Sequence, residues 1–351
     1  MASCQMSMTW LAAYPAIVKS LNDEREYRFI TLDNGLRALL VSNLTGTSNK
    51  SDEVDSDWSE ESFSSTEDEE FGMDRHDHDL ESAREGEKKS AAALCVGVGC
   101  FSDPDDIPGI AHFLEHMVFL ERLKYPLEKS FHDKIHNYGG STDTRTDYER
   151  TVFRFDVERK YFRKSLDLFA KFFAAPLLLG ENVEREVEAL DSEYHTALHE
   201  DGKRLHQILA SCARPGHPMG KFLLGNMETL YYVPAENKTS IYEMMAVFHN
   251  RLYSAHYMTL AVQSKDTLDT LETMVRESFS GIPNNQLEQP NFSSYKDPFD
   301  TDLFRKWYKV VPVKDINRLD IMWAFPSLHH CYSCHRFYLP LLVFHTRLVH
   351  I

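Results

Sequence analysis

Cysteine, long apolar runs and a basic leader are scarce in this 351-residue sequence, and each scarcity excludes a class of protein. Six cysteines are too few for a dense secreted disulfide framework. No stretch approaches the about 18 consecutive apolar residues of a membrane-spanning helix, since even the segment from Phe337 is interrupted by Pro340 and Arg347. The first twenty residues contain a short apolar run without the basic segment of a secretory signal. We therefore expect a soluble cytoplasmic protein, the alternative being export to the cell surface without such a signal.

Basic residues are scarce in one part of the chain. The net charge is −16, and residues 51–80 hold 13 Asp or Glu against one Arg. Residues 43–90 are so rich in Ser, Asp and Glu that they cannot bury enough apolar surface to offset chain entropy. We predict a disordered acidic insert over 43–90, which is either merely solvated or binds a basic peptide or protein. The hydrophobic fraction of the whole chain, 42%, is nevertheless sufficient for a folded core.

Periodicity predicts an α+β fold in which helices pack on a mixed sheet. A turn at Asp33-Asn34-Gly35 indicates a hairpin over 26–42, and the apolar run 91–98 reads as a strand that pairs with this hairpin across the insert. Further strands are expected over 150–157 and 258–264. Helices are expected over 108–120, 128–137, 162–173, 181–199, 238–253 and 266–279.

A short motif carries the chemistry. His112 and His116 are four residues apart, so both lie on one face of the expected helix with Glu115 beside them. His-x-x-Glu-His is the inverted form of the zinc-peptidase motif, in which the Glu acts as base. A catalytic zinc needs three protein ligands. In the helix over 181–199, Glu186 and Glu193 are two turns apart, so one can bind the metal while the other orients a ligand imidazole.

Several further strings accompany this motif. They are Ser102-Asp103-Pro104, Gly109 to Phe119, Lys124-Tyr125-Pro126, Gly139-Gly140-Ser141, Phe155-Asp156-Val157, Arg185 to Glu193 and Gly216-His217-Pro218. Together they resemble the pitrilysin/insulysin family of zinc metallopeptidases, from about residue 15 to 325. The resemblance implies Zn²⁺ held by His112, His116 and Glu193, with Glu186 in support and Glu115 as catalytic base. One departure is the edge strand 143–146, whose sequence Asp-Thr-Arg-Thr differs from the family pattern.

The resemblance also suggests a domain layout. We expect an N-terminal tail over 1–25, a metallopeptidase domain over 26–282, a linker over 283–303 and a truncated second domain over 304–351. Strands at Trp307–Val313 and Leu319–Phe325 would open that second domain, and a tail without family resemblance begins at about 327. Cys331 and Cys334 in this tail match a haem-attachment or metal-knuckle spacing, although chance is the simpler explanation.

The expected function is that of a zinc-dependent metalloendopeptidase acting on peptides, with cleavage near basic residues implied by the resemblance. The alternative is a truncated, weakly active or inactive relative that serves as an acidic peptide- or protein-binding module. The apolar stretch Phe337–Val349 further predicts self-association.

Overall fold

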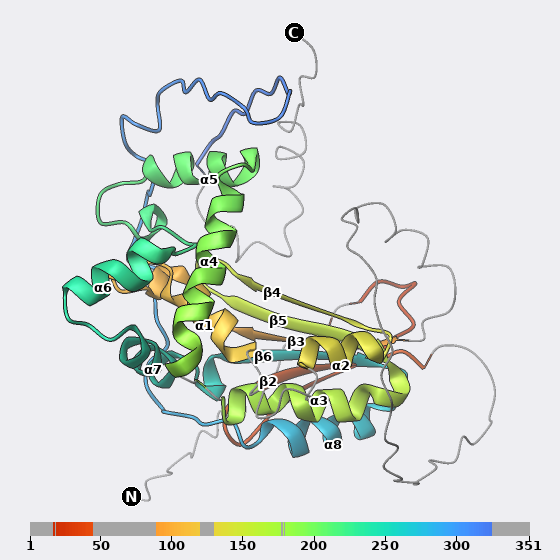
Figure 1. The fold of residues 1–351 in the computed structure, drawn as a ribbon. Coiled ribbons are helices and arrows are strands. Elements are labelled where there is room, and N and C mark those ends of the chain that lie inside the picture. The colour runs from red at the N-terminus through yellow and green to blue at the C-terminus, as the bar shows by residue number, and fades with distance from the viewer. Residues whose placement is uncertain are drawn as a thin grey trace, which may run out of the picture.

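A single mixed sheet organises the computed structural model, which describes residues 17, 19–44, 89–119, 130–176, 178 and 180–324. The six strands are ordered β1-β2-β6-β3-β5-β4 (Figure 1), and every pair is antiparallel except β2 with β6. Their bounds are β1 Glu26–Thr31, β2 Arg37–Ser42, β3 Lys89–Val96, β4 Ser141–Thr146, β5 Thr151–Glu158 and β6 Met258–Ser264. The predicted α+β architecture is confirmed.

The pairing of β3 differs from the prediction. It was expected to pair with the first hairpin, but β6 lies between them, with Ala92 of β3 opposite Val262 and Leu40 of β2 opposite the same residue. Periodicity reveals which residues of a strand face the core but not which strand is its neighbour. Because Met258, Leu260 and Val262 are at most 1% exposed, β6 has the apolar character of a central strand.

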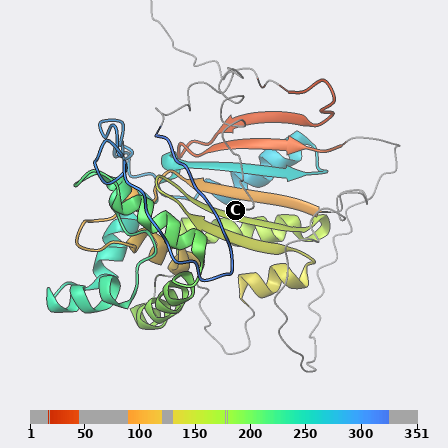
Figure 2. The same ribbon diagram turned by 90° about the horizontal axis from the view of Figure 1, so that it is seen from above.

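Helices cover one face of the sheet, as the two views show (Figures 1 and 2). Helices α1, α2, α3 and α8 contact the strands, whereas α4 packs on α1 and α7 also contacts α1. The helix bounds are α1 Ile110–Phe119, α2 Phe131–Asn137, α3 Arg159–Ala174, α4 Val183–Ala197, α5 Asp201–Ser211, α6 Val233–Glu236, α7 Ile241–Leu252 and α8 Leu268–Phe279. Shorter helical turns are η2 Cys100–Ser102, η3 Gly180–Asn182, η4 Pro218–Gly220, η5 Glu228–Tyr232 and η6 Ala255–Tyr257. In the described residues no helix is both long and apolar enough to cross a membrane.

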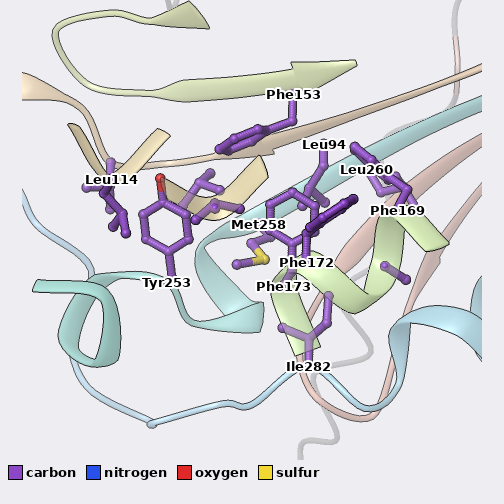
Figure 3. Packing of buried hydrophobic residues seen from close by; sticks show 14 of the residues in the cluster. Leu94, Leu114, Phe153, Phe169, Phe172, Phe173, Tyr253, Met258, Leu260 and Ile282 are labelled. Carbon is purple, nitrogen blue, oxygen red and sulfur yellow. The ribbon is translucent and has the colours of Figure 1, made fainter. Parts of the chain in front are cut away.

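The core between sheet and helices is rich in phenylalanine. Figure 3 shows Phe153 and Leu260 from the strands close to Phe169 and Phe173 of α3. Phe169 is fully buried and lies within 5.2 Å of the ring centre of Phe173. Removing a buried Phe side chain costs about 3–5 kcal/mol, so this packing fixes α3 and, through it, α1 on the sheet.

The segment after α8 is not the pair of strands that the sequence suggested. Residues 301–324 contain no strand in the described part of the chain. Instead, Val313 N–H donates to Asp201 Oδ1 (2.9 Å) and Arg204 Nη1 donates to Val311 O (2.9 Å), so the segment lies against α5. A strand needs the backbone of a neighbouring strand as partner, and here side chains of α5 take that role. The strands predicted at Trp307–Val313 and in the described part of Leu319–Phe325 are therefore not formed.

Other expectations fall mainly outside the described residues. These are the acidic insert, of which only its ends are described, the tail from about 327, the Cys331 and Cys334 pair, and the apolar stretch proposed for self-association. β3 begins at Lys89, two residues before the strand predicted from the sequence.

Candidate metal centre

Helix α1 begins on a buried carboxylate. Asp103 accepts hydrogen bonds from the backbone N–H of Gly109 (2.8 Å) and of Ala111 (3.1 Å), which have no partner within the first turn of the helix. Burial raises the pKa of Asp103 to about 7, and the two N–H groups and Lys221 oppose this rise. Lys221 also donates to the carbonyl of Phe101 (3.1 Å). The start of α1, two residues before His112, is thus tied to the loops that flank it.

A close approach of two glycines positions the first histidine. Gly109 has φ +97°, and a Cβ there would lie 2.3 Å from Cα of Gly225. This contact brings the neighbouring carbonyl of Leu224 to 2.8 Å from His112 Nδ1. Because a carbonyl can only accept, Nδ1 must carry the proton, which leaves Nε2 of His112 as a lone-pair donor.

Three side chains from α1 and α4 converge. Oε2 of Glu193 lies 3.6 Å from His112 Nε2 and 3.7 Å from His116 Nε2. One ligand atom from each of the three residues falls within 4.8 Å of the others. Ligands at about 2.0–2.2 Å from a tetrahedral zinc are about 3.4 Å apart, so this donor set fits such an ion with small adjustments.

Glu186 stands behind His116. Its Oε2 lies 3.7 Å from His116 Nδ1, and its Oε1 accepts a hydrogen bond from Arg185 Nε (3.3 Å). Burial opposes protonation of His116, but contacts with Glu186 and Glu193 outweigh burial and raise its pKa to about 9. The pKa of Glu193 is lowered mainly by His116. The electrostatics therefore favour positive charge at this position, either a proton or a cation.

Glu115 faces the same space without belonging to the three-residue group. It is only 4% exposed, and Thr146 Oγ1 of strand β4 donates a hydrogen bond to its Oε2. Sequence reasoning did not identify this role of Thr146. The segment Ser-Thr-Asp-Thr-Arg-Thr has no apolar alternation that would mark it as a strand, so only its place in the edge-strand motif could have drawn attention to it.

A cleft of about 1250 Å³ is lined by His112, His116, Glu193, Glu115 and Thr146. One wall is the free edge of the sheet at β4, the other is α5 with the end of α4, and residues 222–229 close one side. The structure thus brings together all five residues singled out in the sequence, and it adds α5, which was not predicted.

Comparison with known proteins identifies the family. The model of insulinase (peptidase family M16) matches residues 80–216, and that of the peptidase M16 inactive domain matches residues 240–351. The chain belongs to the insulinase family of peptidases. The resemblance found in the sequence is therefore confirmed. The second match crosses the boundaries expected at 283 and at about 327, and those domain boundaries stay predictions.

Relatives of this insulinase-family chain are longer than it is. Human nardilysin is 47% identical over 356 residues, covering 92% of this chain and 31% of the relative. Mouse insulin-degrading enzyme is 35% identical over 300 residues, covering 86% and 25%. The crystal structure of pitrilysin matches with a TM-score of 0.65 at 30% identity, covering 83% of this chain and 26% of pitrilysin. The chain thus spans about a third or less of these relatives. As an insulinase-family metallopeptidase it is expected to use a divalent metal ion, for which His112, His116 and Glu193 offer a group of ligands.

Proposed function

We propose that this chain forms the zinc-binding part of a metalloendopeptidase, with His112, His116 and Glu193 as ligands. The observation that carries the proposal is the position of one Glu193 oxygen within 3.6–3.7 Å of both imidazole Nε2 atoms, in a cleft that Glu115 also lines. Glu186 would hold the His116 ring in place from its other nitrogen.

The remaining residues supply proton transfer and orientation. Bound zinc would polarise a peptide carbonyl and acidify water. Glu115 would accept the proton of the attacking water and pass it to the leaving amine. Thr146 fixes one oxygen of Glu115 by its hydrogen bond and so leaves the other oxygen for the proton. The Leu224 carbonyl keeps His112 in the tautomer that offers Nε2.

The substrate would be a peptide in extended conformation. Within the described residues β4 is the last strand of the sheet and lines the cleft, and an extended chain can pair with such a strand edge. We further propose a preference for peptides with basic residues, which rests on the net charge of −16 and on Glu228 and Asp147 in the cleft. The names of the relatives support peptide hydrolysis, since one of them degrades insulin.

Metal content tests the ligand set. The purified chain should hold about one zinc, and His112→Ala, His116→Ala or Glu193→Ala should each remove most of it. Glu188→Ala, on the exposed side of the same helix α4, is the matched control and should leave zinc unchanged. A variant that keeps its zinc excludes the altered residue as a ligand.

Hydrolysis tests the catalytic role. Glu115→Gln should retain zinc and lose hydrolysis of a fluorogenic peptide with paired basic residues, because an amide cannot accept the proton of the attacking water. Loss of zinc together with activity would instead make Glu115 part of the ligand set. Absence of hydrolysis in the zinc-loaded, unaltered chain would contradict the proposed function and favour the peptide-binding alternative.

A further inference from the structure

Two cationic side chains line the cleft from different walls. Arg145 lies on the edge strand β4, next to Thr146, and Lys203 lies in the first turn of α5. Within the part of the chain that the structure describes, neither has an ion pair or a hydrogen bond. Arg204, in contrast, is paired with Asp201 at 3.1 Å. Neither positive charge of Arg145 and Lys203 is therefore held by a close partner among the described residues, while Lys203 acts at longer range on Glu193, whose pKa it helps to lower.

Both cations act on the same imidazole. His206 of α5 lies in the cleft wall, and its Nε2 is 2.5 Å from the hydroxyl of Tyr148, at the turn that follows β4. Burial lowers the pKa of His206, Asp147 opposes this, and Lys203 and Arg145 lower it further. Tyr148 lies three residues after Arg145 and His206 three residues after Lys203, so the Tyr148–His206 hydrogen bond holds the two cations at the same part of the cleft.

The acids that line the cleft offset only part of the charge of Arg145 and Lys203. Glu115 and Glu193 would be neutralised by a divalent ion at the metal centre. Asp147 acts on His206 against the two cations, but its carboxylate is shared with the N–H of Tyr148 (2.9 Å) and with Arg150 Nη2 (3.9 Å). Glu228 also lines the cleft, from η5. An anion between β4 and α5 would relieve the repulsion of the two cations.

We propose that Arg145 and Lys203 select peptide substrates that place a carboxylate between β4 and α5. This inference rests on the proposed function and refines its substrate class: the carboxylate is either an Asp or Glu side chain or a free C-terminus. Arg145 suits this task because its planar guanidinium can donate two parallel hydrogen bonds to a carboxylate. Glu228 also lines the cleft and could contact a basic residue of the same peptide, so the cleft would recognise charge of both signs.

Peptide binding tests the inference independently of hydrolysis. The zinc-loaded full chain with Glu115→Gln is titrated with fluorescent peptides of equal length, in which one Glu is moved along an otherwise uncharged sequence. Matched peptides carry Gln or Lys at the same positions, and each is made with a free and with an amidated C-terminus. We expect one position at which the peptide with Glu binds more tightly than the peptide with Gln, and the peptide with Lys binds more weakly than both. The differences in affinity should become smaller as salt is added.

The variants assign the effect to the two residues. Arg145→Gln and Lys203→Gln should each reduce the Glu-over-Gln preference by about 2- to 5-fold, the range of a partly exposed ion pair. Arg163→Gln is the control, since Arg163 lies on α3 and pairs with Glu277 (2.7 Å); it should leave the preference intact. A preference that depends on the free C-terminus would identify the terminal carboxylate as the ligand.

The outcomes separate the two proposals. Equal affinity for the Glu, Gln and Lys peptides, no measurable binding of any of them, or a preference that survives both Arg145→Gln and Lys203→Gln would overturn the inference. Failure of the unaltered chain to hydrolyse any peptide, combined with a Glu preference that the variants remove, would contradict the proposed function and leave the carboxylate site standing.

Discussion

Replacing Gly109 with alanine should weaken both the fold and the metal centre. Its backbone has φ +97°, where a residue with Cβ is strained by about 1–2 kcal/mol. The new Cβ would also lie 2.3 Å from Gly225 Cα and 2.5 Å from Gly225 N, whereas carbon contacts are normally about 3.5–4.0 Å. The two backbones must separate by about 1 Å. Overpacking of this kind costs about 1–3 kcal/mol, so the expected loss is about 2–5 kcal/mol in total.

Gly216 provides a matched control for this change. It has φ +78°, yet nothing lies within 4 Å of a Cβ built on it. Gly216→Ala should therefore carry only the backbone strain of about 1–2 kcal/mol. Thermal unfolding of the metal-free variants measures the difference, at about 2–4 °C per kcal/mol for a domain of this size.

Zinc affinity gives a second readout for Gly109→Ala. Separation of Gly109 from Gly225 should draw the Leu224 carbonyl away from His112 Nδ1, and loss of such a partner typically lowers metal affinity about 10- to 100-fold. Gly216→Ala should leave the affinity unchanged. Equal unfolding temperatures for the two variants, or zinc affinity unaffected by Gly109→Ala, would refute the argument that this contact positions the metal centre.

Three more predictions concern α1 and its surroundings. Thr146→Val should leave zinc bound but lower kcat by about 10- to 100-fold in a peptidase assay, because Glu115 loses the donor that orients it. Asp103→Ala should lower the free energy of unfolding in urea by about 1–3 kcal/mol, since buried N–H groups lose their acceptor. His116, with its raised pKa, stabilises the metal-free fold most below pH 6.5, and this contribution should be lost as pH rises toward about 9. Zinc must displace the proton of His116, so zinc affinity measured by calorimetry should rise between pH 6.5 and about 9. Glu186→Gln should lower the upper end of this pH range, and an unchanged range would contradict the contribution of Glu186 to the raised pKa of His116.

The parts of the molecule that could be predicted from the sequence are those marked by a local pattern in their own residues. The apolar stripes and the histidine spacing gave α1, α4 and β6 to within a few residues, and the five site residues do lie together. Helix α5 was missed because Gly202 stands in its first turn and few of its residues are buried. Strand β4 was expected over 143–146 from the family resemblance alone, because its all-polar sequence has no apolar alternation, and the contact of Thr146 with Glu115 was not predicted. The strands expected after residue 304 depended on a pairing partner, which no periodic pattern can specify.

The place of β6 in the middle of the sheet has a consequence for how the chain folds. β6 is the last of the described strands along the chain, yet it joins β2 on one side and β3 on the other. Until residue 264 has left the ribosome, the sheet would consist of two separate pieces with unpaired edges. Contacts of such large sequence separation form slowly because the intervening chain must first be closed into a loop. Helix α1 also packs on α7, which ends shortly before β6 in the chain. Its histidines and Glu193 are therefore expected to reach their final spacing late, and nascent chains shorter than about 265 residues should fail to retain zinc.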